Sequence, residues 1–252
     1  MSYYNIIFSP TGGTKKVADI LIDSIGKKWH EIDLCHPVDS VILTAEDICM
    51  VSVPSYGGRA PGLAIERMKA ISGNGAKAVL VCVYGNRAWD DTLTELQDTL
   101  ENLGFQCVAA VAAVAEHSIL RQFAAGRPDT QDAAQLKSFA QQILSKLNDG
   151  IVCTLNLEGS HGTYLEYGGV PVKPEGNERC IACGLCAKKC PAEAIDPNNP
   201  RQTSKDICIS CMRCVSLCPT HARDMNPDFM AGMAAKMEPK LSGHKENYLF
   251  LS

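Results

Sequence analysis

Two runs of cysteines between positions 180 and 218 are the part of the sequence best suited to chemistry. Each run has the spacing C-x2-C-x2-C-x3-C followed by proline, and the second run repeats the first 28 residues later. Three cysteines so closely spaced can ligate three irons of one 4Fe-4S cubane. Two alternatives fit the spacing less well. Zinc sites usually hold two well-separated pairs of cysteines, and plant-type 2Fe-2S centres have more residues between their first two cysteine ligands. A reduced cluster of structural thiols is the remaining alternative.

The tandem motif resembles the two-cluster ferredoxins of bacteria, which form a small α+β domain. In that family the fourth cysteine of each run ligates the cluster of the other run. The resemblance implies one 4Fe-4S cluster on Cys180, Cys183, Cys186 and Cys218, and a second on Cys208, Cys211, Cys214 and Cys190. Hydrophobic residues between these cysteines would limit water near the sulfurs and so influence the reduction potential of each cluster.

The overall composition is that of an ordinary globular protein. The chain has 252 residues, 46% hydrophobic and 21% charged, with a formal net charge of −4. No basic tail or block of like charge suggests nucleic-acid binding. No apolar run approaches the ~18 to 20 residues that span a bilayer, and the first eight residues lack the basic start of a signal peptide. We therefore expect a cytoplasmic protein without membrane contact. In such a reducing compartment, thirteen cysteines indicate metal ligation, because they would not normally pair as disulfides.

Residues 1–150 alternate apolar, strand-like runs with segments of helical period. The expected strands cover 3–8, 31–34, 48–53, 78–83 and 105–114. Unbroken apolar runs are typical of strands that are buried on both faces. Apolar residues at helical spacing mark the segments 17–25, 93–103 and 136–147, and Pro61 suits the first turn of a further helix. This part therefore predicts an α/β fold, a doubly wound parallel sheet of five strands.

In a doubly wound sheet, ligands bind in the loops at the carboxyl ends of the strands. The loop after the first expected strand reads S-P-T-G-G-T and runs into a helix. Backbone N–H groups and three hydroxyls therefore meet at the positive N-terminus of that helix, where a phosphate binds well. It has no Walker lysine and no G-x-G-x-x-G pattern, which disfavours nucleoside triphosphates and dinucleotides. A mononucleotide phosphate fits this loop, and the alternative is a capped turn of small residues without a ligand.

Two further loops pair an aromatic residue with glycine, which suits a flat ring ligand. They read P-S-Y-G-G-R-A-P from position 54 and Y-G-N-R-A-W-D-D from position 84. With these loops, residues 1–150 resemble a short-chain flavodoxin, whose sheet has the order 2-1-3-4-5 and binds FMN. The resemblance implies a phosphate loop of Ser9, Thr11, Gly12, Gly13 and Thr14. It implies that the ring is held by Pro54, Ser55, Tyr56, Gly57, Gly58, Gly85, Asn86, Arg87, Trp89 and Asp90, with Tyr56 or Trp89 stacking on it.

Three residues are candidates for a catalytic role. Flavodoxins reorient a second-loop peptide on flavin reduction, and Gly57-Gly58 occupies the matching place. The sequence departs from the family in Arg59 and Arg87, cations that would favour a reduced, anionic flavin; the alternative is that both are solvated or pair with aspartates of the third loop. His117 follows the fifth strand and could reach the ring as a proton donor, or could be a hydrogen-bonding surface residue.

Changes in composition divide the chain into four segments. Glycines and prolines interrupt the stretch after position 150, which we interpret as a linker that begins with an edge strand over 151–157. The expected segments are an FMN domain at 1–150, a linker at 151–175, a two-cluster domain at 176–226 and a partly helical tail at 227–252.

The tail carries a hydrophobic stripe. Phe229, Met230, Met233 and Met237 recur at helical spacing, and Y-L-F-L follows at 248–251. We interpret both features as core packing or a subunit contact, which makes a homodimer possible; a groove for a partner is the alternative.

Opposite charge favours contact between the two cofactor domains. Residues 180–224 carry six basic and four acidic residues, whereas residues 1–150 carry 13 basic and 17 acidic ones. We therefore expect the cluster domain to dock on the FMN domain, which would shorten the path between cluster and flavin.

Over nearly its whole length the chain resembles the fused flavodoxin-ferredoxin proteins of anaerobic microbes, including E-H-S at 116–118 and G-R-P-D at 126–129. The resemblance implies an electron-transfer flavoprotein that links a low-potential donor to an acceptor through FMN and two 4Fe-4S clusters. The alternatives are an FMN-dependent reductase of a small quinone, disulfide or nitro compound, and a redox-sensing module. The expected partner is a redox protein or a small-molecule acceptor.

Overall fold

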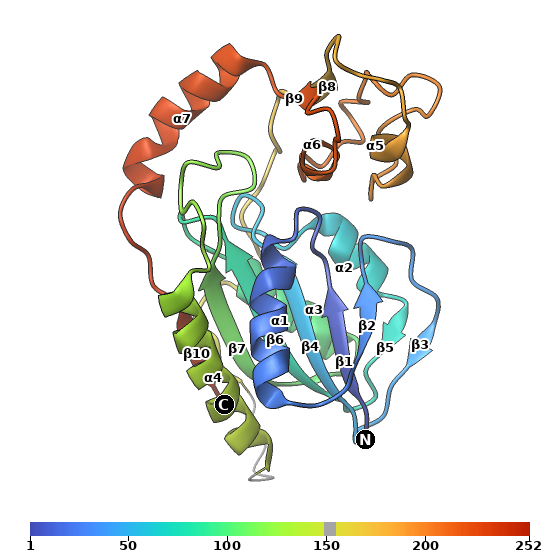
Figure 1. The fold of residues 1–252 in the computed structure, drawn as a ribbon. Coiled ribbons are helices and arrows are strands. Elements are labelled where there is room, and N and C mark those ends of the chain that lie inside the picture. The colour runs from blue at the N-terminus through green and yellow to red at the C-terminus, as the bar shows by residue number, and fades with distance from the viewer. Residues whose placement is uncertain (149–154) are drawn as a thin grey trace.

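The main sheet of the protein has six strands. The computed structural model describes residues 1–148 and 155–252, and the order across the sheet is β10-β7-β6-β4-β1-β2 (Figure 1). The bounds are Tyr3–Ile7 for β1, Trp29–Asp33 for β2, Ile48–Pro54 for β4, Lys77–Tyr84 for β6, Gln106–Val114 for β7 and Tyr248–Leu251 for β10. All except β10 run parallel, so the predicted five-stranded parallel sheet of order 2-1-3-4-5 is confirmed.

Helices cover both faces of this sheet. Two helices pack on each other and on one face, and two others cover the opposite face. The first pair is α1 (Gly13–Ile25) and α4 (Thr130–Asn148), the second is α2 (Gly62–Met68) and α3 (Thr92–Asn102), and β3 (Val41–Ile42) pairs separately with β5 (Ile71–Ser72). Within residues 1–148 and 155–252, no helix is long and apolar enough to cross a membrane.

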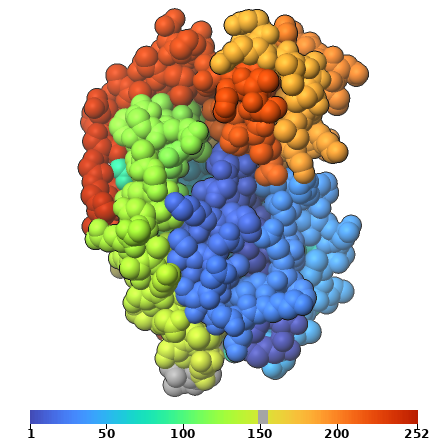
Figure 2. Space-filling model, viewed as in Figure 1, coloured from blue at the N-terminus to red at the C-terminus, as the bar shows by residue number. Residues whose placement is uncertain are grey.

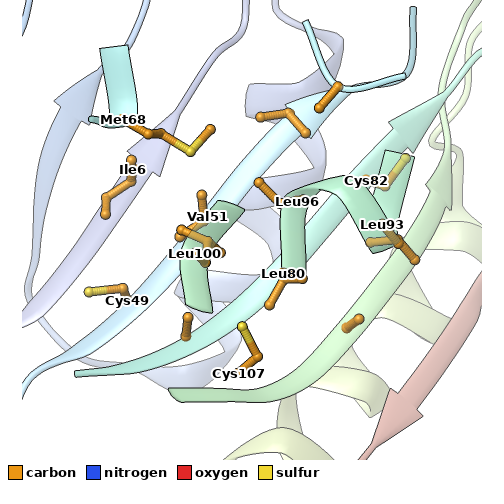
Figure 3. Close-up of a cluster of buried hydrophobic side chains, with 14 of the residues drawn as sticks. Ile6, Cys49, Val51, Met68, Leu80, Cys82, Leu93, Leu96, Leu100 and Cys107 are labelled. Atoms are coloured by element: carbon orange, nitrogen blue, oxygen red, sulfur yellow. The ribbon is translucent and has the colours of Figure 1, made fainter. Parts of the chain in front are cut away.

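The cysteines outside the two motifs belong to the hydrophobic core. Cys49, Cys82 and Cys107 lie among leucine, isoleucine and valine side chains near α3 (Figure 3), and Cys35 belongs to the same cluster, whereas Cys153 lies outside the described residues. Burial raises the pKa of Cys49 and of Cys107 to about 12. Both thiols are therefore protonated at neutral pH and pack as core side chains, so the spacing of the motif cysteines remains the reason to expect those as ligands.

Strand β10 differs from what the sequence predicted. It pairs antiparallel with the outer edge of β7, which we did not expect, although the predicted core packing is confirmed for Leu249 and Phe250. We expected the edge strand at 151–157 instead. Residues 151–154 lie outside the described part, and 155–157 form no strand, although the Leu155 N–H donates to the Cys107 carbonyl at 3.3 Å. The strand that pairs with this edge of β7 thus comes from a segment after the cysteine motifs. Local sequence patterns do not reveal a pairing between segments so far apart in the chain.

A buried polar network fastens the approach to β10 to the first domain. The Asn247 side chain accepts a hydrogen bond from the Val114 N–H and donates one to the Asp132 carboxylate, each at 2.8 Å. Asp132 also forms a buried ion pair with Arg127. Burial alone would raise the pKa of Asp132, but the hydrogen bonds from Arg127, the backbone and Asn247 lower it to about 2. Arg127 also donates to the Lys245 carbonyl at 2.7 Å, so the returning chain is held by hydrogen bonds whose loss would leave buried polar groups unpaired, at about 1 to 3 kcal/mol each.

The cysteine motifs fold into a small domain with an internal backbone repeat. Left-handed conformations recur at an interval of 28 residues, at 182 and 210, 184 and 212, and 193 and 221. The short helices α5 and α6 show the same interval, and β8 pairs antiparallel with β9. Their bounds are Leu185–Lys188 for α5, Arg213–Ser216 for α6, Glu175–Gly176 for β8 and Arg223–Asp224 for β9. The repeat in the sequence is therefore also a repeat in structure.

The cluster domain lies over the carboxyl ends of the parallel strands. Figure 1 shows it above the first domain, with α7 (Pro227–Leu241) leading from it back toward β10. Arg67 Nη2 donates to the Pro191 carbonyl at 2.6 Å, and Arg213 Nη1 donates to the Pro10 carbonyl at 3.5 Å. The expected docking of the two domains is present. Within the described residues these hydrogen bonds join guanidinium groups to neutral carbonyls, so the contacts do not depend on ion pairs.

Candidate functional site

The first loop ends at the N-terminus of α1. Gly12, the N-cap residue of α1, has φ +93°, a left-handed conformation that suits glycine, and has no side chain to cap the helix itself. The Ser9 hydroxyl accepts a hydrogen bond from the Lys15 N–H at 2.9 Å, which folds the loop over the helix end. Thr11 and Thr14 line a small cavity of about 60 Å³ at this point. The positive end of the helix dipole beside hydroxyl groups suits a phosphate.

The second loop makes a tight turn at Gly57-Gly58. The residues that flank the glycines exchange two backbone hydrogen bonds of 2.9 and 3.1 Å, and the glycines have φ +61° and +89°. A turn with two left-handed residues favours glycine at both positions. A Cβ at Gly58 would lie 2.3 Å from the Asp90 carboxylate, and one at Gly57 would lie 2.1 Å from the Tyr167 ring. The turn is therefore packed between the third loop and the connector.

The third loop lies against His117. A Cβ at Gly85 would lie 2.9 Å from the His117 ring. His117 Nδ1 accepts hydrogen bonds from the N–H groups of Ile119 and Leu120, both at 3.1 Å. Burial, and then the charge of Arg87, lowers the pKa of His117 to about 4. The imidazole is thus neutral at pH 7 with its proton on Nε2, which favours the hydrogen-bonding role over the proton-donor role, the two roles that the sequence left open.

The loops and His117 open into one cavity of about 560 Å³, within the size range of small-molecule sites. The smaller cavity at α1 shares lining residues with it, so the two adjoin. Its walls include Ser55, Tyr56, Gly57, Gly58, Gly85, Arg87 and His117 from the first domain, Tyr167 and Val170 from the connector, Ile209 and Ser210 from the cluster domain, and Phe229, Met233, Lys236 and Met237 from α7. The predicted core packing of the tail's hydrophobic stripe is confirmed for Phe229 and Met230, which pack against Val170, Met212 and Met225. Phe229, Met233 and Met237 also line the cavity, which was not predicted.

The two loop arginines have different environments. Arg59 forms a two-point ion pair with Glu95 at 2.6 and 2.7 Å and donates to the Leu165 carbonyl at 2.6 Å. It is therefore neutralised beside α3 and is not part of the 560 Å³ cavity wall. Arg87 lines that cavity and pairs with Asp90 of its own loop. The geometry thus supports a ligand-facing role for Arg87 and a structural one for Arg59.

The aromatic residues near the site also separate. Tyr56 lines the cavity, whereas Trp89 packs against Tyr84 and Tyr248 with ring centroids 5.2 and 5.1 Å apart. Tyr56 is therefore the better candidate to stack on a ring. Sequence reasoning missed Tyr167, which lies on the second-loop turn and lines the cavity. An aromatic side chain in a glycine-rich connector was the signal that could have found it.

Asn86 connects the third loop to α7. It is buried, has φ +63°, and its side-chain amide donates to the carbonyls of Leu241 and Gly243 at 2.5 and 2.8 Å. The residue after Gly85 therefore fixes the end of the helix that closes the cavity, instead of facing the cavity itself.

The cluster domain contains a cavity between cysteines. Cys190, Cys208, Cys211 and Cys214 line it together with apolar residues such as Ile195. This set includes a fourth cysteine from the other run, as the crossed ligation requires. Burial raises the pKa of Cys211 to about 12, and the neighbouring cysteines add to this effect. Because clusters bind thiolates, loading of these four cysteines would release protons.

The second set of cysteines is more exposed. Cys183 is exposed and the other three are partly buried. Cys218 Sγ accepts a hydrogen bond from the Ala222 N–H at 3.2 Å, and Cys190 Sγ accepts the equivalent bond from the Ala194 N–H at 3.3 Å. The two cysteines expected to cross between clusters thus have the same backbone environment.

The fold and these sites define a class of protein. A doubly wound α/β domain with flavodoxin strand order is joined to a small domain of two repeated cysteine motifs, and this organisation is similar to that of the fused flavodoxin-ferredoxin proteins. Residues 179–223 match the family model of the 4Fe-4S dicluster domain. The chain therefore contains an iron–sulfur domain of that family.

The first domain is similar to solved flavodoxins. A flavodoxin of Streptococcus pneumonia TIGR4 is 21% identical over 57% of this chain and 99% of that one, with a TM-score of 0.42. Flavodoxin 1 from Bacillus cereus is 17% identical over 57% and 98%, with a TM-score of 0.41. A Fusobacterium nucleatum flavodoxin bound to flavin mononucleotide is 14% identical over 58% and 99%, with a TM-score of 0.39. The fold assignment itself rests on the strand order described above.

Proposed function

We propose that the protein transfers electrons between 4Fe-4S clusters on its eight motif cysteines and FMN in the 560 Å³ cavity. One observation carries this proposal. Ile209 and Ser210, which lie between Cys208 and Cys211, line the same cavity as the flavin loops. Ile209 also packs against the core of the first domain. The peptide between two cluster ligands is therefore part of the wall of the flavin site.

The residues of the cavity would divide the tasks of binding. Ser9 and Thr11 at the N-terminus of α1 would hold the phosphate. Gly57-Gly58 and Gly85 would allow the backbone to approach the ring, and neutral His117 would donate a hydrogen bond from Nε2. When bound, FMN supplies the ability to exchange one or two electrons, whereas each cluster exchanges one. The connector and α7 would limit water at this site.

Pulse radiolysis of the loaded protein tests this relay. A rapid one-electron pulse should bleach the clusters first, and flavin absorbance should then change in a first-order phase. We expect the rate of this phase to be independent of protein concentration, because donor and acceptor belong to one molecule. A rate proportional to protein concentration would mean that electrons pass between molecules, and would contradict the proposal.

A second function, reduction of a small acceptor at the flavin, is favoured by the wall that α7 adds. Phe229, Met233 and Met237 give the cavity an apolar side, and Lys236 and Arg87 bring positive charge. This lining suits a planar, apolar acceptor with a carbonyl or nitro oxygen, such as a quinone or a nitroarene. Repeated oxidation of the reduced protein by a small naphthoquinone without oxygen would distinguish this activity from the relay alone.

A further inference from the structure

The two halves of the cluster domain differ in what covers them. Ile181 and Ile209 occupy equivalent places, each directly after the first cysteine of a motif. Ile209 packs against the first domain, whereas Ile181 is 65% exposed. Likewise, Cys211 is buried, whereas its equivalent Cys183 is exposed. Leu217, which precedes another expected ligand of the Cys183 cluster, is 37% exposed. One expected cluster thus faces the flavin cavity and the other faces solvent.

Two arginines border the exposed Ile181. Arg179 Nη2 donates to the His221 carbonyl at 2.6 Å, and Arg201 Nη2 donates to the carbonyl of the residue before Ile181 at 3.2 Å. These bonds hold both guanidinium groups beside the first cysteine motif. The acidic residue nearest to them in sequence is Glu178, which directly precedes Arg179. Figure 2 shows the cluster domain, gold to orange, at the upper surface of the molecule. The Ile181 surface consists of Ile181, Arg179 and Arg201.

We propose that the Ile181 surface is the docking site for a protein electron carrier with an acidic surface. One electron would pass from the partner's centre, which is oxidised, to the cluster on Cys180, Cys183, Cys186 and Cys218, which is reduced, with no change in bonds or protons. An apolar centre with a cationic border complements an apolar contact surrounded by carboxylates, and such charge complementarity mainly raises the association rate. Onward transfer to FMN rests on the proposed function, but docking does not.

Stopped-flow reduction of the loaded protein tests this docking. The donor is an acidic two-cluster ferredoxin, reduced beforehand and freed of excess reductant, and the signal is cluster bleaching. We expect I181E to lower the second-order rate constant at least tenfold, because it places a carboxylate against an acidic partner. The matched control is I207E, since Ile207 is also exposed (51%) but precedes Cys208 of the other set. I207E should keep the wild-type rate, and the wild-type rate should fall with salt.

A small neutral reductant separates docking from folding. Photoreduced deazaflavin should reduce both variants as fast as the wild type. Reduction of I181E by the acidic ferredoxin at the wild-type rate, or an equal loss in I207E, would overturn the proposal. Cluster bleaching without flavin reduction would leave docking intact and contradict only the internal relay.

A separate observation concerns Arg223, at the centre of the cluster domain. It is 2% exposed, and the equivalent residue 28 positions earlier is the buried Ile195. Its guanidinium donates to two proline carbonyls and to the Thr203 hydroxyl, and Nη1 lies 4.0 Å from Cys186 Sγ. Nε is buried without a partner. Among the described residues its hydrogen bonds include no carboxylate, and a buried cation without a counter-charge is costly.

We infer that Arg223 provides the counter-charge for anionic clusters and raises their reduction potential. Reduction adds a negative charge to a cluster, so a nearby buried cation stabilises the reduced state more than the oxidised one. Because the equivalent position is isoleucine, the repeat is electrostatically asymmetric at this point. Arg223 would thus position charge and would not ligate iron.

Potentiometric titration followed by electron paramagnetic resonance tests this role. In R223Q we expect at least a tenfold lower equilibrium constant for reduction of the affected cluster, which is a shift of 59 mV to more negative potential for one electron. R223K should retain most of the wild-type potential because it keeps the charge. The control is R201M, which removes an exposed cation and should shift the potential less. If R223Q does not load iron, R223M is measured in its place; a loaded neutral variant with the wild-type potential would overturn the inference.

Discussion

Replacing Cys190 and Cys211 together by alanine is expected to leave one intact cluster, whereas replacing Cys190 and Cys183 together should remove both. The physical reason is the cavity that Cys190 shares with Cys211 and two other cysteines of the second run. Each double variant loses two ligands, but in the first both belong to one cluster. Iron content should therefore fall from about eight per chain to about four in the first double variant and close to zero in the second.

Iron and sulfide analysis with electron paramagnetic resonance measures this difference. The surviving cluster of the C190A/C211A variant should give a signal without the coupling between two reduced clusters. Cys107 provides the control, since it is a buried core cysteine and C107A should keep all of the iron. If C190A/C183A retained half of the iron and C190A/C211A lost nearly all of it, ligation would be uncrossed and the ligand sets would be wrong.

Replacing Gly57 by alanine should weaken FMN binding at least tenfold, or about 1.4 kcal/mol. The new Cβ would lie 2.1 Å from the Tyr167 ring, and the alanine would have to adopt φ +61°. A left-handed alanine alone costs about 1 to 2 kcal/mol, so either the turn or the tyrosine must move. The dissociation constant of FMN, followed by quenching of flavin fluorescence, measures this effect.

Two further variants separate the causes. G62A is the matched control, because Gly62 begins α2 just after the same loop and a Cβ there meets nothing within 4 Å. Adding Y167A to G57A removes the clash but keeps the backbone strain, so FMN binding should recover in part. Iron content should remain unchanged in all of these variants. Wild-type affinity in G57A would show that the second-loop turn does not hold the flavin.

The parallel sheet could be predicted from sequence because its determinants are local. Strands β4, β6 and β7 are mainly apolar runs, and the loops that follow β1, β4 and β6 are recognisable in sequence, whereas the edge strand β2 has the partly polar sequence WHEID. The ligand sets could be proposed for a similar reason, since cysteine spacing within 40 residues encodes them, and they remain a prediction that the double variants test. The phosphate loop also lies directly between a strand and a helix.

What could not be predicted depends on contacts between distant segments. Arg59 has aspartates close in its neighbouring loop, yet it pairs with Glu95 because α3 brings that carboxylate to the second loop. The methionines of α7 have the spacing of a core-packing helix, but only the position of the cluster domain turns them toward a cavity. Tyr167 lacks any periodic pattern, and its place follows from the path of the connector.

The return of β10 to β7 has a consequence for biosynthesis. This strand follows the iron–sulfur domain in the chain, so the ribosome makes the whole of that domain before the sheet of the first domain can be completed. At about 5 to 20 residues per second, the edge of β7 waits roughly 7 to 27 seconds for its last neighbour. An uncovered edge strand can pair with other chains during that time. In topology the iron–sulfur domain is thus an insertion within the α/β domain, and a chain ending at residue 226 would lack the strand that covers this edge.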